Sequence, residues 1–175
     1  MGRFDFVIGP SQPECGTSAT VAEAIGEAVI GFEFLDDQVA TSIAFLLRRG
    51  DSLGRIVTAE LSFRGKLDLL LSLFAHERPE SVRLLDLREL VAGCFQVEAR
   101  RNQIVHSRWL RGQADQGVKR VKHSARGKRG LQTTAEQIAP DQVDALWQHC
   151  SMLDWWLDQI MLEEFGPEYE SSYVG

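Results

Sequence analysis

Apolar residues recur every three or four positions over four long stretches of this chain, the spacing of a helix with one buried face. These stretches cover roughly residues 20–48, residues 57–74, residues 80–106, and the segment from Pro140 to Gly166. Helices of this length can bury their apolar faces against one another in a bundle. The pattern therefore predicts an all-α fold of four to five helices.

The first and last helices have the clearest apolar stripes. Their apolar positions are Val21, Ile25, Ala28, Phe32, Leu35, Val39, Ile43 and Leu46 in the first helix, and Val143, Leu146, Trp147, Cys150, Leu153, Leu157, Ile160 and Met161 in the last. By the same spacing, Trp147 belongs to the core, as do Phe63, Phe74 and Phe95.

The helical pattern is interrupted between residues 112 and 139, where four glycines punctuate the chain. We expect a short basic hairpin or a loop inserted there before the last helix. Val118–Lys122 and Leu131–Thr134 would form the two strands of the hairpin.

The two ends of the chain lack the helical pattern. Residues 1–17 contain prolines and glycines and predict an extended lead-in, whereas residues 167–175 predict a short acidic tail that frays. One helical domain, residues 18–166, accounts for the rest.

Charge changes this picture, because the net charge of −6 is unevenly distributed. Ten Lys or Arg residues and one acid, Asp115, lie between Arg100 and Arg129, which leaves +9 there and −15 over the rest of the chain. Such a segment predicts an anionic partner on one local surface. The alternative is a solvated basic loop that balances nearby acidic helices.

Composition excludes several classes of protein. No apolar run is long enough to span a membrane, and the first residues do not form a basic and then apolar leader, so we expect a cytoplasmic protein. Cys15, Cys94 and Cys150 are too few and too widely spaced for a disulfide framework or a zinc site. We expect neither a metal nor a cofactor.

The candidate chemistry lies in the segment Arg101–His106. Arginine is charged at all working pH values and can bind two phosphate oxygens at once. Histidine transfers protons near neutral pH. Asn102 and His106, four residues apart, share one face of a helix, whereas Arg101 lies roughly 140° around it from His106.

This segment resembles the signature motif of the HEPN superfamily. The motif has an arginine, a polar residue directly after it, and a histidine after four intervening residues, and it lies late in the third helix of a bundle. The resemblance implies a metal-independent endoribonuclease, a toxin or defence effector, that leaves a 2′,3′-cyclic phosphate on RNA. It also implies a homodimer with a composite site, and an antitoxin protein as a further partner. The tyrosine that toxins paired with a nucleotidyltransferase carry is replaced here by Arg108, which argues against control by AMP transfer.

The expected site has a catalytic and a substrate-binding part. We expect Arg101, Asn102 and His106 to be catalytic, and the residues expected to contact RNA are Arg100, Ser107, Arg108, Trp109, Lys119, Arg120, Lys122, Lys128 and Arg129.

Alternatives from the residues themselves remain open. In the alternative interpretation, Arg101 pairs with Glu98 or another acid, His106 caps a helix or packs in the core, and Trp109 packs against the bundle instead of stacking on a base. The alternative function is a non-catalytic HEPN module that binds RNA, a nucleotide or a protein.

Overall fold

Helices dominate the computed structural model, which describes residues 19–48, 51–111, 118–124, 131–138 and 140–170. The predicted lead-in, together with Lys128 and Arg129, lies outside the described residues. The long helices are α1 (Ala19–Leu47), α3 (Phe63–Glu77), α4 (Arg83–Val105) and α5 (Pro140–Phe165), and the short ones are α2 (Asp51–Ala59) and α6 (Pro167–Glu170). The predicted helical class is therefore confirmed, with a small sheet added to it.

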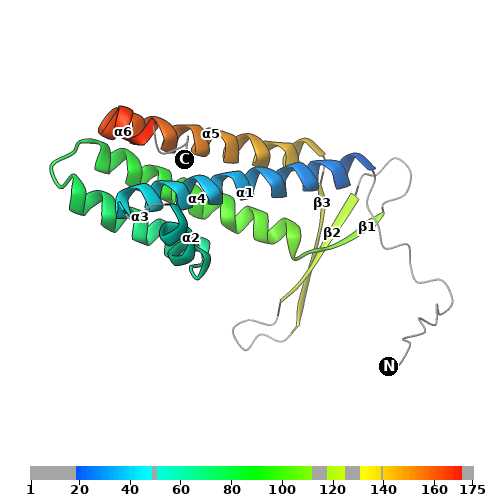
Figure 1. Cartoon of the computed structure of the whole chain (residues 1–175). Coiled ribbons are helices and arrows are strands. Elements are labelled where there is room, and N and C mark those ends of the chain that lie inside the picture. The colour runs from blue at the N-terminus through cyan, green and yellow to red at the C-terminus, as the bar shows by residue number, and fades with distance from the viewer. Residues whose placement is uncertain (1–18, 49–50, 112–117, 125–130, 139, 171–175) are drawn as a thin grey trace, which may run out of the picture.

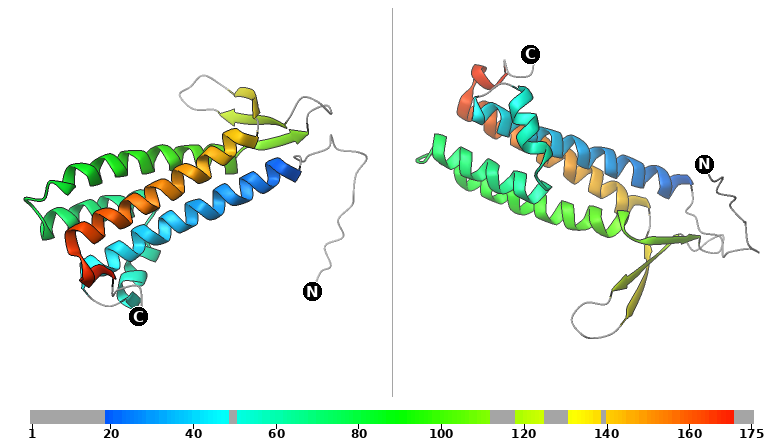
Figure 2. Two further views of the ribbon diagram at one scale, coloured as in Figure 1. Left: turned by 90° about the horizontal axis from the view of Figure 1, so that it is seen from above. Right: turned by 60° about the horizontal axis from the view of Figure 1, so that its bottom comes forward.

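The four long helices lie side by side, and the sheet projects from one end of the bundle (Figures 1 and 2). Its strands are β1 (Arg108–Arg111), β2 (Val118–Ser124) and β3 (Gln132–Ile138), antiparallel and in the order β1-β2-β3. The predicted two-stranded hairpin was therefore incomplete, because the sheet has an additional strand, β1, which starts two residues after His106. Ile138, only 3% exposed, packs in the core and anchors the last strand to the bundle.

The single helix predicted over residues 57–74 was wrong, because two helices meet there. The first ends in a turn in which the Leu61 N–H donates to the Thr58 carbonyl at 3.1 Å. Ser62 then caps the second, its Oγ accepting from the Gly65 N–H at 3.2 Å. A serine cap starts a new helix here although the apolar spacing gives no sign of a break.

The predicted frayed tail was also wrong over the residues that the structure describes. Gly166 adopts a φ of 57°, a left-handed conformation that ends α5 and turns the chain into α6. Tyr169 is fully buried, and its hydroxyl accepts from Gln38 Nε2 at 3.0 Å and shares a hydrogen bond with Ser42 Oγ at 3.1 Å. These contacts tie α6 to the middle of α1.

The core follows the predicted stripes of α1 and α5, with Phe63 and Phe74 buried and Phe95 partly buried against it. Trp147 departs from the prediction, because it is 44% exposed. Its ring lies against Gly31, where an added Cβ would come within 2.8 Å of Trp147 Cδ1. Trp147 therefore covers a gap at the edge of the α1–α5 seam.

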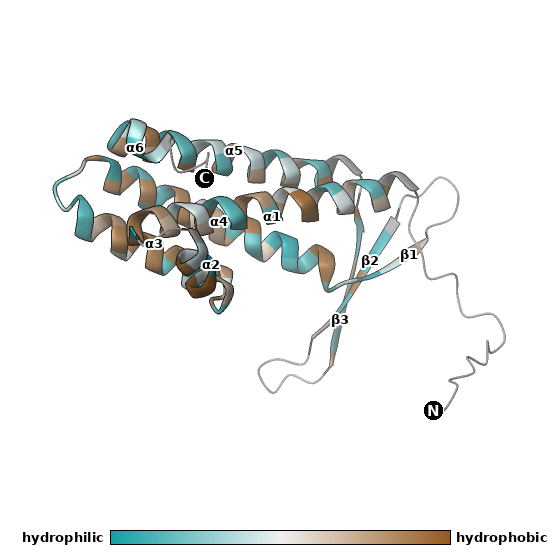
Figure 3. Cartoon of the chain, in the orientation of Figure 1, coloured by the Kyte–Doolittle hydropathy of each residue, from teal (hydrophilic) through white to brown (hydrophobic). Residues whose placement is uncertain are grey.

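Figure 3 shows apolar residues concentrated in the helices and hydrophilic residues along much of β2. None of the described helices has the length and apolarity needed to cross a membrane.

The close packing of α2 on α1 leads to a stability prediction. A Cβ at Gly54 would lie 2.2 Å from Ala44 Cβ, so Gly54→Ala must push the two helices apart. We expect a loss of roughly 1–3 kcal/mol in the free energy of unfolding, measured by urea denaturation. Gly26→Ala is the matched control, because nothing lies within 4 Å of its Cβ, and it should gain up to about 1 kcal/mol from helix propensity. A Gly54→Ala protein as stable as the wild type would contradict this packing.

Candidate functional site

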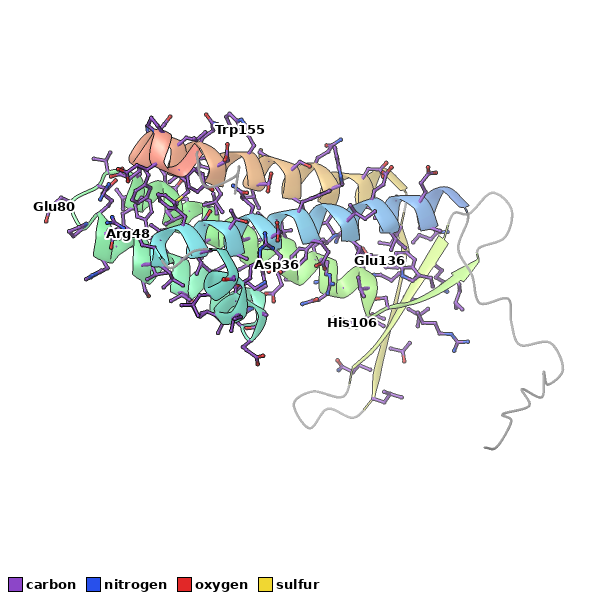
Figure 4. The ribbon with its side chains drawn as sticks, viewed as in Figure 1. Asp36, Arg48, Glu80, His106, Glu136 and Trp155 are labelled. Carbon is purple, nitrogen blue, oxygen red and sulfur yellow. The ribbon has the colours of Figure 1, made fainter. Side chains whose placement is uncertain are left out.

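His106 ends α4 and lies at the junction of the bundle and the sheet (Figure 4). Its backbone N–H donates to the Asn102 carbonyl at 3.1 Å, which closes the last turn. The imidazole is exposed and has no hydrogen-bond partner among the described residues. The side chain is therefore accessible to a ligand from solvent.

Arg101 points toward α1, away from the helix face that carries His106. Its Nη2 lies 3.5 Å from Glu33 Oε1, and its guanidinium lies 5.1 Å from the centroid of the Phe32 ring. Its Nη1 donates to Asn102 Oδ1 at 3.3 Å, while its Nε is buried without a partner in the described part of the chain. The structure therefore brings Arg101 and Asn102 together but records no side-chain contact of either with His106.

The acid that Arg101 contacts is not Glu98, because Glu98 accepts instead from Arg64 Nε at 2.7 Å. Glu33 and Phe32 come from α1, almost 70 residues before Arg101 in the sequence. No local signal in the chain marks them as neighbours of the motif.

Ser107 and Trp109 join the motif to the sheet. Ser107 Oγ donates to the Gln103 carbonyl, and Trp109 Nε1 donates to the Ile104 carbonyl at 3.0 Å. Trp109 also packs, partly buried, against the core. Of the two interpretations of this residue, packing is the one that the structure shows.

The basic residues of the sheet are divided between its faces. Trp109, Arg120 and Glu136 form one cross-strand row, on the face that carries the buried Ile138. Arg120 is only 11% exposed, and its Nη2 lies 2.5 Å from Glu136 Oε2, while its Nη1 is buried without a partner among the described residues. It is therefore built into the bundle side of the sheet.

Two accessible cations, Arg108 and Lys119, lie on the other face of the sheet, where both are exposed. Lys122 is also exposed, but it lies on the face of Arg120, further along β2. The basic surface next to His106 is thus smaller than the count of basic residues suggests, because Arg120 is committed to an ion pair.

Arg100 projects to a different side of α4 from Arg101, into a surface groove between α4 and α5. His149 lines the same groove, although no motif in the sequence marks it as a site residue. The adjacent residues Arg100 and Arg101 therefore lie on two different surfaces of the bundle.

The two thiols in the described part of the chain offer no reactive nucleophile. Burial raises the pKa of Cys94 to about 12 and that of Cys150 to about 11, so both stay protonated at neutral pH. Burial also raises the pKa of Asp154, with a further contribution from the neighbouring Asp158 carboxylate. Within the described ranges, no group of three or more His, Cys, Asp or Glu side chains is arranged to hold a metal ion.

Chemically, the end of α4 offers one accessible imidazole, one guanidinium with a weak partner, and exposed cations on the adjoining sheet.

Comparison of the chain with protein-family models, with curated proteins and with solved structures finds no match in any of the three.

Proposed function

We propose that this chain is a HEPN-type, metal-independent endoribonuclease, a toxin or defence effector that acts in the cytoplasm and is held in check by an antitoxin protein. The observation that carries the proposal is the exposed His106 imidazole at the end of α4, one turn beyond Arg101 and Asn102. The exposed cations Arg108 and Lys119 follow directly on the sheet, where an RNA backbone would bind.

In the proposed reaction, the His106 imidazole removes the proton from a ribose 2′-hydroxyl. The 2′-oxygen attacks the adjacent phosphorus, and the bond from phosphorus to the 5′-oxygen breaks. The products are a 2′,3′-cyclic phosphate and a 5′-hydroxyl, the latter protonated by a general acid. Arg101 stabilises the charge on the phosphorane oxygens, and Asn102 orients the phosphate.

Arg101 must leave Glu33 to reach a phosphate. The 3.5 Å distance and the 62% exposure of the Glu33 side chain describe a weak surface ion pair. A phosphate binds a guanidinium through two parallel hydrogen bonds and can replace that carboxylate. Glu33 would then hold the arginine in place between rounds of binding.

A general acid is needed opposite the base, and one copy of the motif supplies a single histidine. We propose that a second copy of the chain supplies it, through an apolar face formed by α1 and α2. Ile30 and Phe34 of α1 are 56% and 66% exposed there, beside a hollow that α2 also lines. Exposed apolar side chains gathered on one face are typical of an interface. Glu33 lies between Ile30 and Phe34 in sequence, so this face borders the partner of Arg101.

A second candidate function is a non-catalytic HEPN module that binds RNA, a nucleotide or a protein. It is favoured by the engagement of Arg101 with Glu33 and by the His106 imidazole, which no described residue orients. Such a module would bind RNA through the exposed cations and release it uncut.

The first test of the proposal is RNA cleavage in excess EDTA. We expect the wild type to cut and to leave 2′,3′-cyclic phosphate ends, because no step requires a metal. His106→Ala should be at least ~100-fold slower, the usual contribution of general acid–base catalysis. Circular dichroism should show an unchanged fold, since the imidazole is exposed. An uncut panel of RNAs, or an equally active His106→Ala protein, would leave the binding module as the better assignment.

The second test addresses the composite site. Phe34→Glu places a charge in the α1–α2 apolar face and should give a monomer, by light scattering after size exclusion, that no longer cuts RNA. Trp155→Glu is the matched control, because Trp155 is 61% exposed on α5, on the other side of the bundle from His106 in Figure 4. It should remain a dimer with full activity. A wild type that cuts RNA as a monomer would exclude the shared site.

A further inference from the structure

The groove between α4 and α5 has an apolar floor and a polar rim. Its volume is about 530 Å³, in the range of sites for small ligands. Val97, Leu146 and Leu153 are nearly fully buried beneath it. Its rim is formed by the side chains of Gln96, Arg100, Gln142, His149 and Met152.

The charge of the groove is of one sign. Among the described residues that line it, Arg100 and His149 are the ionisable ones, and none is an acid. Neither has an ion-pair partner among the described residues. Most arginines in or directly after the described helices do pair with an acid, namely Arg48, Arg55, Arg64, Arg78, Arg83 and Arg101. An unpaired guanidinium beside an apolar floor suits a ligand with an anionic group attached to a flat, weakly polar body.

The position of the groove relates it to the motif. Adjacent residues of a helix point about 100° apart, so Arg101 faces α1 while Arg100 faces α5. Arg100 and His106 are six residues apart, roughly 9 Å along the helix axis. That separation is of the order of the spacing between neighbouring phosphates in an extended RNA strand. The two residues also lie about 120° apart around the helix, so one strand contacts both the groove and His106 by curving around the end of α4.

We propose that this groove binds one unpaired nucleotide of the RNA substrate, a neighbour of the nucleotide that is cut. Its phosphate contacts Arg100, and its base lies on the floor of Val97, Leu146 and Leu153. The amides of Gln96 and Gln142 stand at the rim, where they can donate to or accept from a base edge. This inference rests on the proposed function, and it specifies that the substrate of the proposed endoribonuclease is single-stranded RNA.

The experiment measures binding apart from cleavage. A short fluorescein-labelled single-stranded RNA is titrated with His106→Ala protein, which keeps the RNA intact, and binding is followed by fluorescence anisotropy. In that background, Ala145→Trp fills the groove and Arg100→Gln removes its charge. Arg88→Gln is the control, because it removes the same charge from an exposed position on α4 outside the groove. Thermal unfolding verifies that each variant folds.

We expect Ala145→Trp and Arg100→Gln each to weaken binding about tenfold, the size of one lost base or phosphate contact. Arg88→Gln should change it by no more than about twofold. An RNA of abasic sites should also bind about tenfold more weakly to the His106→Ala protein. The abasic RNA and the normal RNA should bind equally tightly to the double variant His106→Ala/Ala145→Trp, because tryptophan already fills the base site.

The outcomes separate this inference from the proposed function. If both groove variants bind RNA as tightly as Arg88→Gln does, the groove is not a nucleotide site, even when the wild type cuts RNA. If binding depends on the groove but the wild type cuts no RNA, the groove is a nucleotide site and the proposed endoribonuclease activity is wrong. If abasic RNA binds as tightly as normal RNA, no base occupies the groove and the inference is overturned.

Discussion

The end of α4 is fixed by three hydrogen bonds to its last carbonyls, and the rest of the site depends on them. A helix leaves its final C=O groups without partners inside the helix. Here the His106 N–H, the Ser107 hydroxyl and the Trp109 indole N–H donate to the carbonyls of Asn102, Gln103 and Ile104, in that order. The segment that satisfies the helix end is the same segment that starts the sheet. The direction of β1 and the exposure of His106 therefore have one cause.

This constraint also decides which cations are accessible. Once Trp109 faces the bundle, its cross-strand neighbours Arg120 and Glu136 must face it too, because side chains alternate along a strand. Arg108 and Lys119 consequently face solvent. The basic residues are clustered in the sequence, but the alternation of side chains in the strands separates them. Arg120 forms an ion pair on one face, whereas Arg108 and Lys119 are accessible on the other.

The sequence predicts what depends on local spacing, and it misses what depends on distant neighbours. The apolar period places α1 and α5 within a residue or two, because one buried face imposes that period. The same period cannot show that Ser62 divides two helices or that Trp147 lies at the edge of the seam. Strand β1 escapes prediction because no glycine or proline separates it from α4. The motif itself is visible in sequence, but Glu33, the partner of Arg101, is brought to it only by packing of α1.

The hydrogen bonds between Tyr169 and the pair Gln38 and Ser42 join the first long helix to the last described turn of the chain. During synthesis, α1 leaves the ribosome long before Tyr169 is added, so Ser42 and Gln38 meet their Tyr169 partner late. The contact of α6 with α1 forms only after residue 169 has left the exit tunnel. For a protein proposed to cut RNA, this part of the packing is therefore completed when nearly all of the described chain has been translated.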